Sequence, residues 1–267
     1  MMSATRVGSV GSDQRDSYKA LFYPESTFGD ITDIDGTVAF YTRVNALIQS
    51  AFVVLDFGCG RGSRQDDTVA FRRVLCTLKG RVSKVIGIDV DPIGQENPYL
   101  DEFRPLLPGS AWPVEDGATD LIVCDSVMEH LPDPPSFFQE ARRVLADGGY
   151  LCIRTPNVHS YLGVASRLVP NRYHSKVLSK VQTGRKNEDV FPTLYRCNTI
   201  SRLRRSLRNC NFRAVVYGYE AEPGYLNFSK LAYATGVVHQ KFAPGFLRPT
   251  IFAFGQSQPA GRHAGDL

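Results

Sequence analysis

The stretch FVVLDFGCGRG, residues 52–62, joins a short apolar run to a loop with a glycine at every second position. Five of the six residues 52–57 are apolar, which is typical of a strand covered on both faces of a parallel sheet. Gly58, Gly60 and Gly62 follow, and glycine lets a backbone pass close to a ligand where a Cβ would collide. The stretch therefore predicts a strand that ends in a loop built around a nucleotide-like ligand.

The spacing of these glycines separates the loop from two common phosphate loops. A dinucleotide fold has the pattern G-x-G-x-x-G, in which the third glycine would come one residue later, and a Walker loop requires Gly-Lys-Ser/Thr. Here Asp56 opens an acid-x-Gly-x-Gly-x-Gly pattern. That pattern suits a ligand with a positive amino or sulfonium group and no phosphate. S-adenosylmethionine fits this description.

Strand and helix patterns alternate on both sides of the loop. We expect strands at 52–57, 83–88, 119–124, 149–154, 213–219 and 250–255, a weaker one within 102–112, and helices at 37–49, 67–78, 136–146 and 199–209. Asp35 is a candidate cap for the first helix. Short apolar strands separated by helices imply a sheet covered on both faces, so the fold class is α/β, doubly wound and mostly parallel.

The second strand runs into GIDVDP, residues 87–92, which places two carboxylates after it. Asp89 is suited to accept hydrogen bonds from both hydroxyls of a ribose, and Asp91 is the second choice. An isolated aspartate at a strand end more often caps a helix or a turn. Because Asp89 accompanies the glycine loop, we predict that it is a ribose ligand.

Four segments in order carry a resemblance to a known family: VVLDFGCGRG, VIGIDVDP, DLIVCDSVMEHLPDP and RVLADGGYLCIRTPN, which begin at residues 53, 85, 120 and 143. They resemble the successive motifs of class I S-adenosylmethionine-dependent methyltransferases, in particular the small-molecule, type 11-like group with a Glu-His pair after the fourth strand. The resemblance covers residues 36–157 and, more faintly, 198–220 and 249–256. It implies a Rossmann-like sheet of seven strands whose last strand inserts antiparallel beside the sixth, and an enzyme whose cofactor is S-adenosylmethionine.

The same resemblance implies the cofactor contacts. They are Asp56, Gly58, Cys59, Gly60 and Gly62 in the glycine loop, Asp89 at the ribose, Val90 against the adenine and Asp125 near the methionine portion. Two features depart from the family. The connection between Gly62 and Asp89 is long, so residues 63–67 are expected to protrude or to cover the cofactor. The loop at 107–112 lacks the acid with which relatives bind the adenine amino group.

Methyl transfer from a sulfonium is an in-line displacement, so alignment of the reactants supplies most of the acceleration. A base is needed only when the acceptor must lose a proton. His130, after the strand at 119–124, and His159, after the strand at 149–154, are the candidate catalytic residues, and Asn157 and Tyr161 are candidate substrate ligands. The alternative for His130 is a hydrogen-bonded residue that holds the turn at 132–135. Glu129 beside it has no identifiable further metal ligand, so we predict no metal site.

Length and composition predict one domain. The chain has 267 residues, of which 43% are hydrophobic and 22% charged. We expect disordered ends at 1–16 and 257–267, a single methyltransferase domain at 17–256, and insertions at 157–197 and 223–247 that form a substrate lid. The six cysteines form no CxxC pair, and neither a membrane-spanning run nor a secretory signal is recognisable. These features lead us to expect a cytoplasmic protein.

Positive charge is concentrated in one segment. Residues 154–213 hold 13 Lys or Arg and 2 acids, a balance of +11, while the rest of the chain has a balance of −7. This segment predicts either an anionic partner or a solvated basic face. We therefore expect a small or medium acceptor that is methylated on oxygen, such as a glycan, a lipid-linked sugar or a secondary metabolite.

Three alternatives stay open from the sequence. The basic segment suggests that nucleic acid is the substrate, although the chain has no Asn/Asp-Pro-Pro-Tyr/Phe motif and no recognisable RNA-binding module. A second alternative is an S-adenosylmethionine-binding scaffold without catalysis. The third is peripheral contact with a membrane through the aromatic residues of 223–247, namely Tyr225, Phe228, Tyr233, Phe242 and Phe246, for which we favour ordinary core packing. No oligomeric state is predicted.

Overall fold

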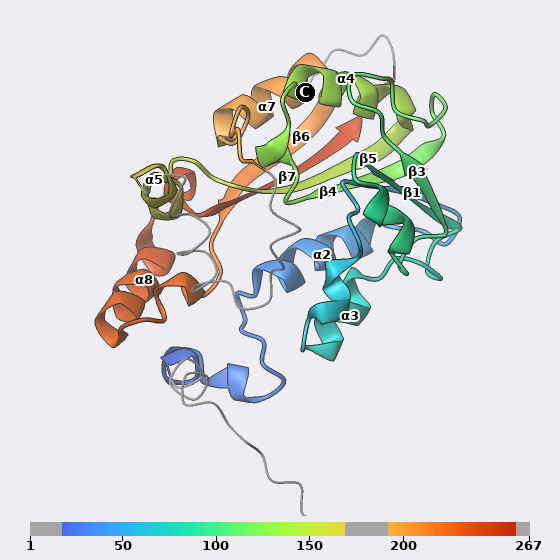
Figure 1. Cartoon of the computed structure of the whole chain (residues 1–267). Coiled ribbons are helices and arrows are strands. Elements are labelled where there is room, and N and C mark those ends of the chain that lie inside the picture. The colour runs from blue at the N-terminus through green and yellow to red at the C-terminus, as the bar shows by residue number, and fades with distance from the viewer. Residues whose placement is uncertain (1–17, 169–191, 260–267) are drawn as a thin grey trace, which may run out of the picture.

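The computed structural model describes residues 18–168 and 192–259, and the side chains of 165–168 are not described (Figure 1). The predictions of disorder at 1–16 and for most of the tail therefore lie outside the described residues, as do His174, Lys176, Lys180, Arg185 and Lys186 of the basic insertion. The described part contains one sheet with helices on both of its faces.

The sheet has seven strands in the order β3-β2-β1-β4-β5-β7-β6. Their bounds are β1 Val53–Phe57, β2 Lys84–Asp89, β3 Glu102–Pro105, β4 Thr119–Asp125, β5 Leu145–Pro156, β6 Phe212–Tyr219 and β7 Thr250–Ser257. The strands from β3 to β5 are parallel, and β7 pairs antiparallel with both β5 and β6. This confirms the predicted doubly wound α/β fold and the antiparallel last strand.

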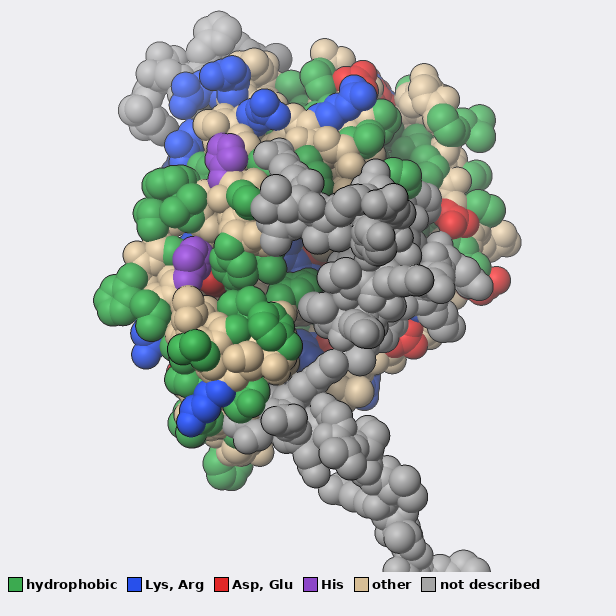
Figure 2. Space-filling model, turned by 60° about the vertical axis from the view of Figure 1, so that its left-hand side comes forward, with side chains coloured by type: hydrophobic (Ala, Val, Ile, Leu, Met, Phe, Trp, Pro, Cys, Tyr) green, Lys and Arg blue, Asp and Glu red, His purple; other side chains and the backbone are tan. Residues whose placement is uncertain are grey.

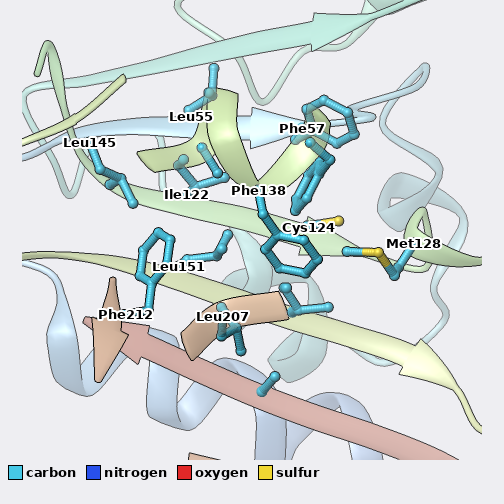
Figure 3. Close-up of a cluster of buried hydrophobic side chains, with 14 of the residues drawn as sticks. Leu55, Phe57, Ile122, Cys124, Met128, Phe138, Leu145, Leu151, Leu207 and Phe212 are labelled. Carbon is cyan, nitrogen blue, oxygen red and sulfur yellow. The ribbon is translucent and has the colours of Figure 1, made fainter. Parts of the chain in front are cut away.

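Two hydrophobic cores lie on opposite faces of the sheet because successive residues of a strand point to opposite sides. In β1, Leu55 faces α4 (Pro134–Val144) and α7 (Ile200–Asn209), where it joins Phe138 and Leu207 (Figure 3). Val54 faces the other side and joins the core under α2 (Gly36–Leu47) and α3 (Ala70–Cys76). Continuous apolar strands are the sequence signature of this double burial.

Two further helices lie beyond one end of the sheet, at the left of Figure 1. They are α5 (Tyr161–Leu168), which follows β5, and α8 (Lys230–Phe242), which lies between β6 and β7. The short 3-10 turns η6 (Gly224–Leu226) and η7 (Gly245–Leu247) flank α8. Tyr233 of α8 is fully buried and packs against Tyr18, Phe22 and Tyr23 of the N-terminal segment, which forms a third, small core.

Element boundaries differ from the prediction at a few positions. β3 ends at Pro105, and Trp112 packs between Phe57 and Phe137 instead of extending the strand. α3 begins three residues late because the Asp67 carboxylate accepts the N–H of Val69 and holds that stretch in a turn. β7 continues to the buried Ser257, whose hydroxyl donates to the Ala146 carbonyl, so the expected disorder from 257 is wrong at this residue.

Candidate active site

The glycine loop lies where the parallel strands β1, β2 and β4 end side by side. Phe57, the last residue of β1, is in register with Ile88 of β2 and Cys124 of β4. The N–H of Gly58 donates to the Ile88 carbonyl at 2.8 Å, which fixes the start of the loop against β2. The carboxyl edge of a doubly wound sheet is the usual place for a ligand in this fold class.

Each glycine of the loop has a positive φ, but the three are needed for different reasons. A Cβ on Gly58 would come within 2.4 Å of Val127, and one on Gly62 within 2.6 Å of the Asn97 side chain. A Cβ on Gly60, whose φ is +49°, would meet no atom of residues 18–168 and 192–259 within 4 Å. Packing of the protein explains Gly58 and Gly62, whereas Gly60 turns a bare backbone toward open space.

Asp89 holds this backbone through its carboxylate. The N–H of Gly60 donates to Asp89 Oδ2 at 2.8 Å, and the N–H of Asp91 donates to Oδ1 at 2.9 Å. A carboxylate has about four acceptor positions, so each oxygen keeps a second one for a hydroxyl donor such as a ribose. Asp91 instead caps the 3-10 turn η3 (Pro92–Glu96) through the N–H of Ile93, and Val90 next to Asp89 is exposed.

Cys59 contributes only its backbone to the loop. Its thiol is buried against Gly87, where a Cβ on the glycine would approach Sγ to 2.8 Å, and burial raises the pKa of this thiol. The carbonyl of Cys59 accepts a hydrogen bond from Asn97 Nδ2 at 2.9 Å. Asn97 is a supporting residue that the sequence analysis missed.

Asp56 lies beneath the loop in an ion pair with Arg64. The guanidinium of Arg64 is 3.1 Å from Asp56 Oδ2 and lies over the rings of Tyr41 and Tyr99. Burial raises the pKa of Asp56, although the positive charge of Arg64 opposes this shift. Arg64 belongs to the segment that was expected to protrude. Its side chain instead ties the 3-10 turn η2 (Ser63–Asp66) to β1.

Asp125, at the end of β4, is held by neighbouring elements. Arg154 of β5 donates to both of its carboxylate oxygens, at 2.6 Å each, and the Tyr41 hydroxyl donates to Oδ2 at 3.1 Å. Burial disfavours the charge of Asp125, yet Arg154 keeps its pKa below the ordinary value. The next residue, Ser126, has a φ of +61°, a strained conformation for a non-glycine residue and one that gathers at functional sites.

The Glu129–His130 pair, in the 3-10 turn η4 (Met128–His130), binds the segment that precedes α7. The carbonyl of Glu129 accepts the N–H groups of Leu194 and Tyr195. Its buried carboxylate accepts the Thr155 hydroxyl at 3.0 Å, and burial raises its pKa. His130 Nδ1 is 3.0 Å from the Pro192 carbonyl, so this histidine joins η4 to the segment after the insertion.

The residues predicted after β5 have different surroundings. Asn157 is 1% exposed; Nδ2 donates to the Phe246 and Arg248 carbonyls, and Oδ1 accepts the N–H of His159. Its polar atoms therefore bind the protein backbone and join β5 to the loop before β7, and the substrate role of Asn157 stays a prediction. The residue His159 is exposed.

Tyr161 belongs to a polar cluster that sequence spacing gave no means of finding. Its ring lies edge-on to the imidazole of His239, with 5.0 Å between centroids. His239 Nδ1 lies 2.8 and 2.9 Å from the two carboxylate oxygens of Glu220, a buried residue whose pKa burial raises. The three residues come from α5, α8 and the end of β6, and only folding brings them together.

The described residues contain neither a metal-binding cluster nor a membrane-spanning helix. Within 18–168 and 192–259, no three or more His, Cys, Asp and Glu side chains are grouped so as to hold a metal ion. No helix in this part of the chain is long and apolar enough to cross a membrane. All six cysteines are free thiols.

Comparisons with known proteins agree with this site. A family described as a methyltransferase domain matches residues 37–215. A Mycobacterium tuberculosis protein named probable S-adenosylmethionine-dependent methyltransferase is 30% identical over 109 residues, which are 39% of this chain and 35% of that protein. A ubiquinone biosynthesis O-methyltransferase of Acinetobacter baumannii is 28% identical over 113 residues, which are 39% of this chain and 44% of that enzyme. The chain thus spans less than half the length of these curated relatives.

Solved structures share the fold over nearly the whole chain. A chain from the complex of the Haloferax volcanii Trm112 methyltransferase activator with a methyltransferase has a TM-score of 0.51 at 15% identity, and the match covers 94% of this chain and 99% of that one. An S-adenosylmethionine-dependent methyltransferase from Thermotoga maritima has a TM-score of 0.50 at 15% identity, and the match covers 92% of this chain and 96% of that one.

The glycine loop fits the cofactor of this family. Bare backbone at Gly60 faces open space, and the Asp89 carboxylate beside it keeps acceptor positions for two hydroxyls. Because the family match covers well over half of the sequence, the fold, the site and the relatives lead to one assignment. The chain belongs to the methyltransferase domain family.

Proposed function

We propose that the chain is a class I methyltransferase that uses S-adenosylmethionine and methylates an oxygen of a small or medium acceptor, such as a glycan, a lipid-linked sugar or a secondary metabolite. One observation carries the choice of oxygen. A carbonyl can only accept a hydrogen bond, so His130 Nδ1 must carry the hydrogen that is shared with Pro192, and Nε2 is the basic nitrogen of the neutral ring. A hydroxyl acceptor needs such a base, and His130 lies five residues after Asp125. The printed name of the Acinetobacter relative, an O-methyltransferase, also supports oxygen.

Residues of the chain would have the following roles in the reaction. When bound, S-adenosylmethionine supplies a methyl group on a positively charged sulfur. Gly60 and Asp89 would hold the nucleoside portion and Asp125 would lie near the methionine portion. His130 Nε2 would take the proton that the acceptor hydroxyl loses as its oxygen forms the new bond to the methyl carbon, while the carbon–sulfur bond breaks and its electron pair stays on sulfur. Glu129 Oε1, 3.8 Å from Nε2, would stabilise the imidazolium that results.

We infer that the acceptor binds at the end of the sheet next to α5 and α8. The register supports this location. Pro156, the last residue of β5, and Tyr219, the last residue of β6, both pair with Thr250, the first residue of β7. Glu220 and His239 follow at this edge, and Tyr161 lies against them. The described parts of the two insertions, 157–168, 192–197 and 223–247, would form the walls of the acceptor site, as the lid prediction requires.

Labelling tests the acceptor class directly. The purified protein is incubated with S-adenosylmethionine labelled on the methyl group and with a cell extract, which is then separated into small molecules, lipids, nucleic acid and protein. Label in the small-molecule or lipid fraction, attached to oxygen by NMR of the purified product, is the expected result. Label in nucleic acid would contradict the acceptor class. Cofactor binding by calorimetry without any transfer would favour a scaffold.

A further inference from the structure

Around α8 the molecule exposes a set of large apolar side chains that we call the α8 patch. Its members are 43 to 79% exposed: Tyr225, Phe228, Leu231, Val238, Phe242 and Phe246. Among the five aromatic residues for which the sequence favoured core packing, Tyr233 alone is buried. Core packing is therefore the wrong account of the other four.

Helical spacing gathers the patch on one side of α8. Leu231, Val238 and Phe242 are seven and four residues apart, so they share one face of the helix. Tyr233 and Val237 lie on the opposite side and are buried. Figure 2 turns the α5 and α8 end of the molecule forward and shows apolar side chains gathered there with cationic side chains among them.

The charge around the patch has one sign. Residues 223–249 contain Lys230, Lys241 and Arg248 and neither Asp nor Glu. Both lysines are exposed. Two acids precede this region: Glu220 is buried and bonded to His239, and Glu222 is half-buried and accepts the Thr32 hydroxyl at 3.3 Å.

The exposed apolar side chains and the positive charge together indicate what kind of partner the α8 patch binds. A second copy of the chain would bring the same patch against itself in a two-fold dimer, and three cations would then meet three cations, with no acid of residues 223–249 to pair with them. An anionic lipid surface satisfies both features, because apolar side chains enter the boundary of the acyl chains while lysine and arginine meet the phosphates. We propose that the α8 patch docks the enzyme on an anionic membrane surface.

The test is flotation of the full-length protein with lipid vesicles. Binding is expected to vesicles of phosphatidylcholine mixed with phosphatidylglycerol, to be much weaker with phosphatidylcholine alone, and to fall as salt is raised. Phe242→Ser with Phe246→Ser should reduce the partition coefficient about tenfold or more, since two large apolar side chains no longer leave water. Lys230→Gln with Lys241→Gln should reduce the partition coefficient on anionic vesicles.

A matched control uses two equally exposed apolar residues outside the patch. Val74 on α3 and Val215 on β6 are 66 and 65% exposed, and Val74→Ser with Val215→Ser should leave vesicle binding unchanged. Calorimetric binding of S-adenosylmethionine verifies that each variant is folded, and it does so independently of the acceptor. Failure of the wild type to float with anionic vesicles, or equal losses in patch and control variants, would overturn the proposal. So would a patch variant that converts an oligomer to a monomer in sedimentation, because the patch would then bind protein.

Discussion

At Gly60, the effect of a substitution on ligand binding can be distinguished from its effect on folding. Its φ of +49° imposes strain on any side chain, but the space around it is open. Gly58, by contrast, is packed against Val127, so a substitution there damages the protein before any ligand is considered. A test of cofactor binding therefore belongs at Gly60.

Gly60→Ala should lower the affinity for S-adenosylmethionine by about tenfold or more, because the new methyl group occupies the side on which the backbone meets the ligand. The left-handed conformation should cost about 1 kcal/mol of folding stability. Gly80→Ala is the matched control, since Gly80 has a φ of +79° and equally open surroundings. Calorimetry and thermal melts should show similar stability losses in the two variants and a loss of affinity in Gly60→Ala alone. Equal affinities would remove Gly60 from the cofactor site.

His130→Asn tests the proposed base while keeping a donor for the Pro192 carbonyl. The maximal rate should fall by about 10² to 10⁴, and the affinity for S-adenosylmethionine should stay within a few-fold. His159→Asn, which alters an exposed histidine, distinguishes the two predicted bases in the same assay. A variant of His130 that melts lower but keeps its rate per folded molecule would make His130 a structural residue.

At the scale of elements, β4 and β5 are joined at their ends by Asp125 and Arg154. Both oxygens of Asp125 are bonded to one guanidinium, and Arg154 also donates to Thr37 of α2 at 2.9 Å. Removing one partner of a buried ion pair typically costs about 3 to 5 kcal/mol because the other charge stays buried. Asp125→Asn should therefore lower Tm more than Asp125→Asn with Arg154→Met.

The same pair predicts a dependence of stability on pH. The pKa of Asp125 is lower in the folded protein than in the unfolded chain, where it is about 3.9. Its contribution is thus complete above that value and is lost as the pH falls through the folded pKa. Melting curves between neutral pH and about pH 3 should show a steeper loss of Tm in the wild type than in Asp125→Asn. An equal loss of Tm with falling pH in the two proteins would show that Asp125 does not cause the dependence of stability on pH.

The sequence predicted the parts of the molecule that local pattern determines. The strands next to the glycine loop are continuous apolar runs, and Asp35 caps α2 through the N–H groups of Thr37 and Val38 as expected. Arg64 and Glu220 could not be assigned partners because Asp56 and His239 approach them only through packing between distant elements. The backbone partners of Asn157 could not be predicted for the same reason, since the carbonyls that it binds lie about ninety residues away along the chain.

At the scale of the whole molecule, the two cores protect nearly every thiol. Cys59, Cys76, Cys124, Cys152 and Cys197 are buried, while Cys210 is half-buried. Burial raises the pKa of each thiol, to about 12 for Cys76, so the reactive thiolate is scarce as well as inaccessible.

A thiol reagent should therefore report global unfolding. In the folded protein Cys210 should react first and the other five thiols together, at the rate of the opening that exposes the cores. Cys210→Ser should remove the fast phase and leave the slow one unchanged. Mass spectrometry of the labelled protein with time would follow both phases. Rapid labelling of Cys59 or Cys124 would mean that the sheet opens locally at the glycine loop.

The position of β7 has a consequence for how the chain is made on the ribosome. β7 lies between β5 and β6 in the sheet, yet it is synthesised after both. Until Gly255 arrives, Leu207 and Phe212 lack the backbone against which they pack, and β5 presents an open edge to other nascent chains. Synthesis from residue 156 to residue 250 takes about 5 to 20 seconds at ordinary translation rates. During that interval a chaperone bound to the β5 edge would protect the chain from aggregation, and once β7 is inserted that edge no longer exists.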